Sequence, residues 1–121
     1  REVAGAQPAL GFQPHLRIEG AVDTLVPESV ATHLIAALRE ALANVARHAN
    51  ASSVDVRTEV RGHEVMLQVD DDGVGIGAGS GRRSGLRNLA LRAAALGGWC
   101  STEALEPDGT GTRLTWRARI R

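Results

Sequence analysis

The sequence contains no lysine: its 14 basic residues are all arginine, and they balance 14 acidic residues. A P-loop needs a lysine that reaches the β- and γ-phosphates, so this absence excludes a Walker-type NTPase. It also excludes an enzyme that forms a Schiff base on lysine. The formal net charge of zero gives no electrostatic reason to expect nucleic acid or an anionic membrane as a partner.

Cysteine and aromatic residues are also scarce. Cys100 is the single cysteine, which excludes an internal disulfide and a metal site built from cysteines. Aromatic residues make up 2% of the chain, so we expect a core of valine, leucine, isoleucine and alanine. No stretch approaches the ~18–20 continuous apolar residues of a membrane span, and no signal peptide is evident. We therefore expect a cytoplasmic domain without direct membrane contact.

The length of 121 residues suits one domain with one core. Residues 1–13 are rich in small and turn-forming residues and are predicted to be a linker or lead-in, which leaves 14–121 as the domain. The chain starts at Arg1 without a methionine, which favours a piece cut from a longer protein.

Hydrophobic periodicity predicts two helices and five strands. Apolar residues recur at a period of about 3.6 from Val30 to Ala49, which predicts a long amphipathic helix that ends near Asn50. A second helix is expected from Leu86 to Leu96, stopped by the two glycines that follow. Strands are expected at 15–19, 54–60, 64–70, 99–105 and 113–120, with a loop over 73–85 and a turn over 106–111.

This order of elements predicts the α+β class. A strand, a helix, a two-stranded hairpin, a glycine-rich loop, a second helix and two further strands favour an antiparallel or mixed sheet covered on one face by helices. Trp99 and Trp116 are expected in the core rather than on a stacking surface.

One stripe of the long helix carries polar groups suited to magnesium and phosphate. Glu40, Asn44, Arg47 and His48 fall within roughly 100° of one another on a helical wheel, beside the apolar stripe. Mg²⁺ prefers hard oxygen ligands, of which the Asn44 amide can supply one, and Arg47 can donate to phosphate. A solvated helix face with a salt bridge would show the same residues, so the helix alone leaves both interpretations open.

Asp71 ends a strand whose inward positions are apolar. By strand parity its carboxylate continues the inward row that begins at Val65, whereas Asp70 and Asp72 point away. A buried carboxylate is costly unless it gains donors, and the exocyclic amine of a nucleotide base is one such donor. Aspartate before glycine is also an ordinary turn signal, so a cap of the turn stays as the alternative.

Glycines crowd the segment between the hairpin and the second helix. No G-x-G-x-x-G spacing occurs in it, so a dinucleotide fingerprint is absent, and Gln68 and Gly79 rule out a calcium loop. Arg82 and Arg83 precede the expected helix N-terminus, which favours an anion there, although solvated arginines would look the same. The segment 109–112 reads GTGT and is typical of a hairpin turn when taken alone.

Taken in order, these elements resemble the Bergerat-fold (GHKL-type) ATPases, which include DNA gyrase, the MutL repair proteins, one class of heat-shock chaperones and the sensor histidine kinases. The order is E-x-x-x-N on a helix, D-x-G-x-G after a strand, a glycine-rich lid, and G-x-G-T before the last strand. Within this group, segments 39–49 (REALANVARHA) and 85–93 (GLRNLALRA) are similar to the NarL-type sensor histidine kinases. The resemblance covers about residues 15–121 and implies a two-layer α/β sandwich.

The resemblance assigns the phosphate end of an ATP site to the long helix. Asn44 would bind Mg²⁺, and Glu40 would be the catalytic residue, a polarising or base-like group beside the metal and the γ-phosphate. Arg47 and His48 occupy positions that approach the phosphates. An acidic residue beside the acceptor histidine of the partner domain is the alternative base.

The same resemblance assigns the adenine end to the strand end and the glycines. Asp71 would accept a hydrogen bond from the adenine amino group, with Thr112 and a water assisting, and Gly73 and Gly75 would let the backbone pass close to the base. Asp72 stands where the family often has asparagine, and the short lid carries no phenylalanine-containing F box. Four further residues are assigned to ATP binding: Gly85, Leu86, Gly109 and Gly111.

The resemblance implies an enzyme, a protein histidine kinase of a two-component system, of which this chain would be the ATP-binding catalytic domain. It would bind ATP and Mg²⁺ and donate the γ-phosphoryl to a histidine in a separate dimerisation domain of the same protein, for relay to a response regulator. None of the four histidines lies in the family's acceptor context, so transfer would need that domain. A Ser/Thr kinase of the anti-sigma-factor type and a non-catalytic nucleotide-binding regulator share the fold and are the alternatives.

Overall fold

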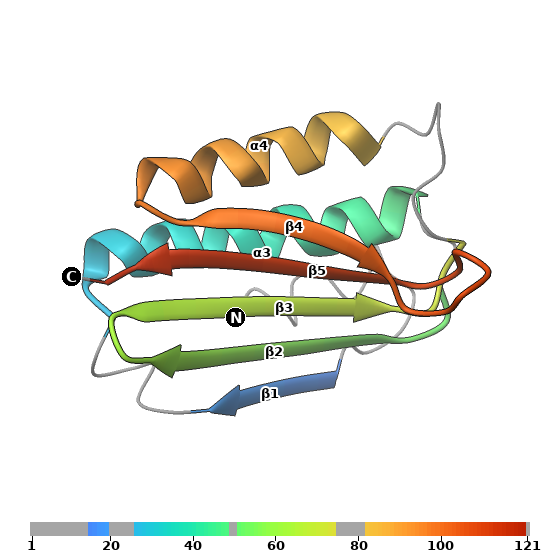
Figure 1. Cartoon of the computed structure of the whole chain (residues 1–121), viewed down its shortest axis with the longest axis horizontal. Helices are drawn as coiled ribbons and strands as arrows, with labels where there is room; N and C mark the ends of the chain where they lie inside the picture. The colour runs from blue at the N-terminus through green and yellow to red at the C-terminus, as the bar shows by residue number, and fades with distance from the viewer. Residues whose placement is uncertain (1–14, 20–25, 49–50, 75–81, 121) are drawn as a thin grey trace.

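The computed structural model describes residues 15–19, 26–48, 51–74 and 82–120, so the predicted lead-in over 1–13 lies outside the described residues. The described chain forms a five-stranded sheet with two helices packed against it and against each other (Figure 1). In chain order the elements are β1 (His15–Glu19), α3 (Glu28–His48), β2 (Val54–Arg61), β3 (Glu64–Asp71), α4 (Arg82–Ala95), β4 (Trp99–Ala104) and β5 (Thr112–Arg119). The predicted α+β class is confirmed. Neither described helix is long and apolar enough to span a membrane.

The strand order is β1-β2-β3-β5-β4, so β3 lies at the centre and β1 and β4 form the edges. β1 pairs with β2 in parallel and the three other pairs are antiparallel, which makes the sheet mixed and mostly antiparallel, as predicted. In this register Asp71 faces Val54 on β2 and Thr112 on β5. The last residue of β3 is therefore enclosed by a strand on each side.

Alternation along the strands and the 3.6-residue period of α3 bury one core between the two layers. Leu42, Leu67, Leu89 and Trp116 are among its largest fully buried side chains. The indole N–H of Trp116 donates to the Leu89 carbonyl at 3.1 Å, which satisfies its single donor and ties β5 to α4. Cys100 packs against the same core, and burial raises the pKa of its thiol to about 11, so the thiol stays protonated.

α3 begins at Glu28, directly after Pro27 and two residues before the first residue of the predicted apolar period, Val30. The Pro27 carbonyl accepts a hydrogen bond from the N–H of Val30 at 3.0 Å, and Glu28 places a carboxylate in the first turn. A negative charge there interacts favourably with the positive end of the helix dipole. The described helix runs to His48, and the predicted end near Asn50 lies outside the described residues.

α4 differs from its prediction at the start. The helix begins at Arg82 rather than at Leu86, so the predicted loop over 73–85 is too long at its C-terminal end. Hydrophobic periodicity cannot detect a first turn that has no apolar residue, and residues 82–85 read RRSG. The end is as predicted: Gly97 has φ +73°, and the N–H of Gly98 donates to the Ala93 carbonyl at 2.9 Å, as in a Schellman motif.

The predicted burial of Trp99 in the core is wrong. Trp99 is 49% exposed because β4 is an edge strand, and the Arg117 guanidinium lies over its ring, 5.1 Å from the centroid. Met66 alternates with the inward row of β3 and is nevertheless only 8% exposed, since long charged side chains of β2 and β5 flank it in the register. The strand predicted to reach Leu105 ends at Ala104.

Candidate functional site

Four elements bring their predicted site residues to the same end of the molecule. The C-terminal ends of α3 and β3, the start of α4 and the start of β5 all lie at one end of the sandwich (Figure 1). Asp71 and Thr112 are strand partners there, and α4 packs against α3. Residues that belong to separate motifs in the sequence are therefore gathered in one region.

Asp71 is buried in this region, with 2% of its surface exposed. Its Oδ1 accepts a hydrogen bond from the Gly73 N–H at 2.9 Å, so the carboxylate caps the turn that follows β3. The inward position of the carboxylate is thus confirmed and the turn cap is present, whereas acceptance of a donor from a nucleotide base stays a prediction. An ionised carboxylate can accept up to about four hydrogen bonds, so capping the turn does not prevent Asp71 from accepting a donor of a ligand.

The segment before β5 closes against the end of β3. The Gly111 N–H donates to the Gly73 carbonyl at 2.8 Å, and Thr112 is 2% exposed beside Asp71. Gly111 has φ +70°, and a Cβ added there would lie 3.1 Å from the Cβ of Leu105 and 3.2 Å from the Asp71 carbonyl oxygen. A side chain at position 111 would therefore be strained and crowded.

Gly109 has a different role in this conformation. It adopts φ +89° in the turn between β4 and β5, and a Cβ added there would meet nothing within 4 Å. Asp108 supports the same turn by accepting from the hydroxyl and the N–H of Thr110 at 2.6 and 2.9 Å, bonds that lower the pKa of the Asp108 carboxyl. The turn geometry accounts for Gly109, and its part in ATP binding stays a prediction.

Asp70, Asp71 and Asp72 are consecutive carboxylates, which would disfavour one another's charge unless each had its own donors. Asp70 points away from Asp71, as strand parity predicts, and accepts from Nε and Nη2 of Arg113 at 3.0 and 2.9 Å. This bidentate hydrogen bond to Asp70 raises the pKa of the Arg113 guanidinium. Asp70 is thus neutralised on the face of the sheet opposite to the buried Asp71.

Asp72 takes its donors from the turn before β2. Its Oδ1 accepts from the N–H groups of Ser52 and Ser53 at 2.7 and 2.9 Å, and its Oδ2 accepts from the Ser52 hydroxyl at 2.5 Å. These hydrogen bonds lower the pKa of the Asp72 carboxyl to about 2, the Ser52 hydroxyl contributing most. This contact was not predicted from the sequence.

On the helical side, α4 packs directly on the predicted metal ligand. Asn44 is 2% exposed, and a Cβ added at Gly85 would lie 2.9 Å from Asn44 Nδ2 and 3.4 Å from Glu40 Oε2. The helical wheel places Asn44 at the border of the core, but the first turn of α4, which the prediction assigned to the loop, covers it. A residue with a Cβ at position 85 would force the Asn44 side chain to move.

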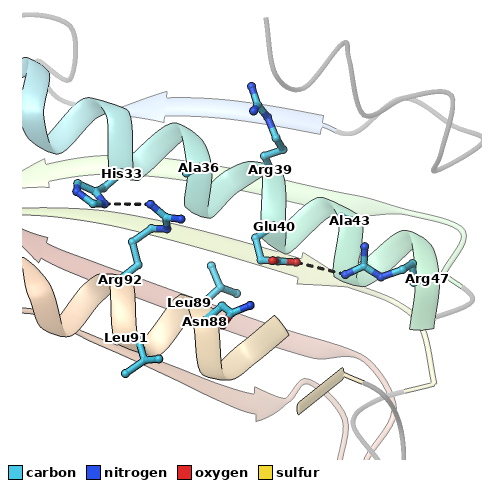
Figure 2. A pocket seen from close by; sticks show the side chains of 10 residues that line it. All are labelled: His33, Ala36, Arg39, Glu40, Ala43, Arg47, Asn88, Leu89, Leu91 and Arg92. Atoms are coloured by element: carbon cyan, nitrogen blue, oxygen red, sulfur yellow. Dashed lines mark hydrogen bonds and ion pairs between the residues drawn. The ribbon is translucent and has the colours of Figure 1, made fainter. Parts of the chain in front are cut away.

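Glu40 and Arg47 project into a groove between α3 and α4 (Figure 2). The groove encloses about 680 Å³. Arg47 Nη2 lies 3.3 Å from Glu40 Oε2, and the two side chains are 56% and 29% exposed, so solvent weakens their ion pair. Arg47 can therefore exchange Glu40 for another anion at low cost. The lining residues are His33, Ala36, Arg39, Glu40, Ala43, Arg47, Asn88, Leu89, Leu91 and Arg92.

Four polar residues of this groove were not among the predicted site residues: His33, Arg39, Asn88 and Arg92. Arg92 Nη1 lies 3.1 Å from His33 Nδ1, and because a guanidinium only donates, that nitrogen of His33 accepts (Figure 2). A signal was present, since His33, Glu40 and Arg47 follow one another at intervals of seven residues and thus share one side of α3.

For three of the predicted ATP-binding residues, the structure adds no support for a role in ATP binding. Gly75 lies outside the described residues, and so does the side chain of His48. Leu86 is partly buried against the core near the start of α4, which is a sufficient structural reason for an apolar residue there. Their roles in ATP binding stay predictions.

The donor set at this end suits Mg²⁺ held by few protein ligands. The part of the chain that the structure describes contains no group of three or more His, Cys, Asp or Glu that could hold a metal ion. Mg²⁺ bound to a nucleotide takes one or two protein oxygens and completes its octahedron with water and phosphate oxygens. The Asn44 amide and the Glu40 carboxylate, which both lie against Gly85, offer such oxygens.

Comparison with known families agrees with this geometry. Residues 29–121 match the family described as Histidine kinase-, DNA gyrase B-, and HSP90-like ATPase. The chain belongs to this family, which implies ATP binding.

Curated relatives show which members of this family the chain is similar to. The chain is 34% identical over 100 residues to the sensor histidine kinase LiaS of Bacillus subtilis, which covers 81% of this chain and 27% of LiaS. It is 35% identical over 94 residues to the nitrate/nitrite sensor protein NarX of Escherichia coli, which covers 76% of this chain and 16% of NarX. The chain is thus similar to sensor histidine kinases over most of its own length, and it spans only between 16% and 27% of the length of these two relatives.

Solved structures share the fold over nearly the whole chain. The blue-light activated histidine kinase of Erythrobacter litoralis superposes with a TM-score of 0.74 at 22% identity, covering 99% of this chain and 43% of that one. The mycobacterial sensor histidine kinase MprB superposes with a TM-score of 0.70 at 16% identity, covering 100% of this chain and 91% of that one. At these identities the likeness establishes the two-layer sandwich alone.

Proposed function

We propose that this domain binds ATP with Mg²⁺ across one end of the sandwich and donates the γ-phosphoryl group to a histidine of a separate dimerisation domain in the same protein. A response regulator then receives the phosphoryl group. The observation that carries the proposal is that a buried carboxylate, Asp71, and a buried amide, Asn44, belong to elements that end in the same region (Figure 1). Burying polar groups is costly, and recognition of a ligand is one reason to retain them.

The base is assigned to Asp71. An ionised carboxylate only accepts, so it favours a base edge that carries an N–H donor, and adenine has one at its exocyclic amine. Thr112, the strand partner of Asp71, adds a hydroxyl that can donate or accept, directly or through a water. Gly73 and Gly111 flank this pair without side chains, which supports a close approach of the base to the backbone.

The phosphates are assigned to α3 and the start of α4. Arg47 leaves its exposed ion pair with Glu40 and donates to phosphate instead. Glu40, once released, is available as the polarising or base-like group. Asn44 supplies an oxygen to Mg²⁺, which when bound neutralises charge on the phosphate oxygens. On the resemblance alone, four further contacts are proposed: His48, Gly75, Leu86 and Gly109.

The acceptor is assigned to another part of the protein. His15 lies 2.8 Å from Asp55 and His33 lies 3.1 Å from Arg92, so these two imidazoles are engaged in structural contacts. None of the four histidines lies in the family's acceptor context, so a histidine outside the domain is the proposed acceptor. We place the domain in residues 14–121 and in the cytoplasm, where ATP is supplied.

Binding and transfer are tested separately. Isothermal titration calorimetry should show ATP binding that weakens when EDTA removes Mg²⁺. With γ-labelled ATP and the dimerisation domain of the same protein, we expect phosphohistidine, which is labile in acid and stable in base. Acid-stable label on serine or threonine would favour the anti-sigma-factor type of kinase, and binding without transfer would favour a nucleotide-binding regulator. Absence of ATP binding would contradict the proposal.

A further inference from the structure

The side chain of Asp72 bridges the two segments that lead to the two ends of the proposed ATP site. Its carboxylate accepts three hydrogen bonds from Ser52 and Ser53 at 2.5 to 2.9 Å. Its N–H also donates to the Ser53 carbonyl at 3.3 Å. We call this set of four hydrogen bonds the Asp72 bridge.

The position of the bridge in the fold connects it to both ends of the proposed ATP site. Asp72 directly follows Asp71, which is proposed to read the base. Ser52 lies shortly after the end of α3, whose last two turns carry Asn44 and Arg47, proposed to hold the Mg²⁺-phosphates. The bridge therefore fastens the strand that carries the base-reading group to the segment that follows the phosphate-binding helix.

The chemistry of the bridge indicates a geometric function. Asp72 is exposed, so burial of apolar surface is not what it contributes. Its pKa of about 2 keeps the carboxylate ionised at neutral pH, and hydrogen bonds to a charged acceptor are stronger than neutral ones. Three donors converge on it from two successive residues, which fixes the turn in position as well as in distance.

Two other aspartates make similar bonds without joining the two ends. Asp70 pairs with Arg113 inside the β3–β5 register, whereas Asp72 and Ser52 lie just beyond the last β2–β3 pair, Val54 with Asp71. Asp108 accepts from the N–H and hydroxyl of Thr110 within its own turn, so it fixes nothing beyond that turn. Asp108 is therefore a chemically matched control for Asp72.

We infer that Asp72 is a positioning residue that sets the spacing between the base-reading and the phosphate-binding ends and thereby couples the two in ATP recognition. The inference rests on the proposed function. Recognition that spans two anchor points is sensitive to their separation, and displacements of about 1 Å can cost up to about 100-fold in enzymes. Loss of the bridge should therefore lower the affinity for Mg·ATP more than it lowers the affinity for adenosine.

The test compares the dissociation constants of adenosine and Mg·ATP by calorimetry for the wild type and for variants. Asp72→Ala should weaken Mg·ATP binding about tenfold and adenosine binding less than about twofold. The ratio of the dissociation constant of adenosine to that of Mg·ATP should therefore fall. Asp72→Asn should restore the wild-type ratio, since the amide oxygen can accept the two main-chain N–H bonds and the amide N–H can donate to the Ser52 hydroxyl. Asp108→Ala should leave the ratio unchanged.

Two outcomes would overturn the inference. One is a wild-type ratio in Asp72→Ala; the other is an Asp72→Asn variant that behaves like Asp72→Ala. If Asp72→Ala does not fold by circular dichroism, Ser52→Ala, which removes only the hydroxyl donor, is measured instead and should lower the ratio about threefold; an unchanged ratio there would likewise overturn the inference. A wild type that fails to bind Mg·ATP would contradict the proposed function, which is a distinct result.

Discussion

The base end and the phosphate end of the proposed ATP site are built in different ways. At the base end, Asp71 and Thr112 are buried between strands, and the turn beyond them is fixed by main-chain hydrogen bonds. At the phosphate end, Glu40 and Arg47 lie partly exposed in a groove between two helices, joined by a 3.3 Å ion pair. The residues proposed to bind the base are thus already held in place, whereas those proposed to bind the phosphates would have to exchange partners when a nucleotide binds.

The largest expected loss of ATP affinity follows from substitution of Asp71 at the base end. Asp71→Ala removes the acceptor proposed for adenine and leaves the buried turn without its cap. We expect ATP affinity to fall about 30- to 100-fold, which corresponds to about 2–3 kcal/mol, measured by calorimetry. Asp70→Ala is the matched control, because its carboxylate pairs with Arg113 on the other face of the sheet. Equal effects of the two substitutions would contradict the assignment of the base.

Gly85→Ala tests the contact between the helices. The added Cβ would lie 2.9 Å from Asn44 Nδ2, and Asn44 is buried and cannot move freely. Overpacking of this kind costs about 1–3 kcal/mol, so we expect Mg·ATP affinity to fall about tenfold while adenosine affinity is unchanged. Arg87→Ala, an exposed position on the same helix, should have no such effect. A parallel loss of adenosine binding in Gly85→Ala would show that the two ends are not separable.

Much of this arrangement could be predicted from the sequence, because it depends on local periodicity. Strand parity places Asp71 inward and Asp70 outward, and both positions are correct. The first turn of α4 could not be predicted, since it contains no apolar residue, and with it the burial of Asn44 was missed. The exposure of Trp99 depends on strand order, which periodicity along one strand does not encode.

The Asp72 bridge was missed for a different reason. Asp72 and Ser52 are 20 positions apart, and their contact follows from the register of β2 against β3 rather than from any local pattern. The pairing of Asp70 with Arg113 across 43 positions is of the same kind. Contacts of this type become predictable only once the strand partners are known.

Arg47→Ala tests whether the phosphate end is exposed, through the salt dependence of its effect on Mg·ATP affinity. Loss of one exposed charge should lower Mg·ATP affinity about three- to tenfold at low ionic strength, and less at high ionic strength, because screening acts on exposed charges. Calorimetry at two salt concentrations measures this. Asp71→Ala should show the same loss at both, since its carboxylate is buried. A salt-independent effect of Arg47→Ala would contradict the exposed character of the phosphate end.

The smallest expected effect concerns the stability of the link between the ends. The folded-state pKa of Asp72 is about 2, below the ordinary value of 3.8, so the bridge contributes its stability fully above about pH 4 and loses it as the pH falls toward 2. Asp72→Asn cannot titrate. Urea unfolding of both proteins should therefore show a difference in the free energy of unfolding that changes between pH 5 and pH 2. A difference that stayed constant would contradict the bridge as described.

The central claim is that one ATP joins a preformed base site to an exchangeable phosphate site. Mapping of backbone amide chemical shifts with adenosine, Mg²⁺-tripolyphosphate and Mg·ATP tests it most directly. We expect adenosine to shift the amides of Asp71, Gly73 and Thr112, tripolyphosphate to shift those of Asn44 and Arg47, and Mg·ATP to shift both sets at one equivalent. A Mg·ATP titration that left either set unchanged would contradict the claim.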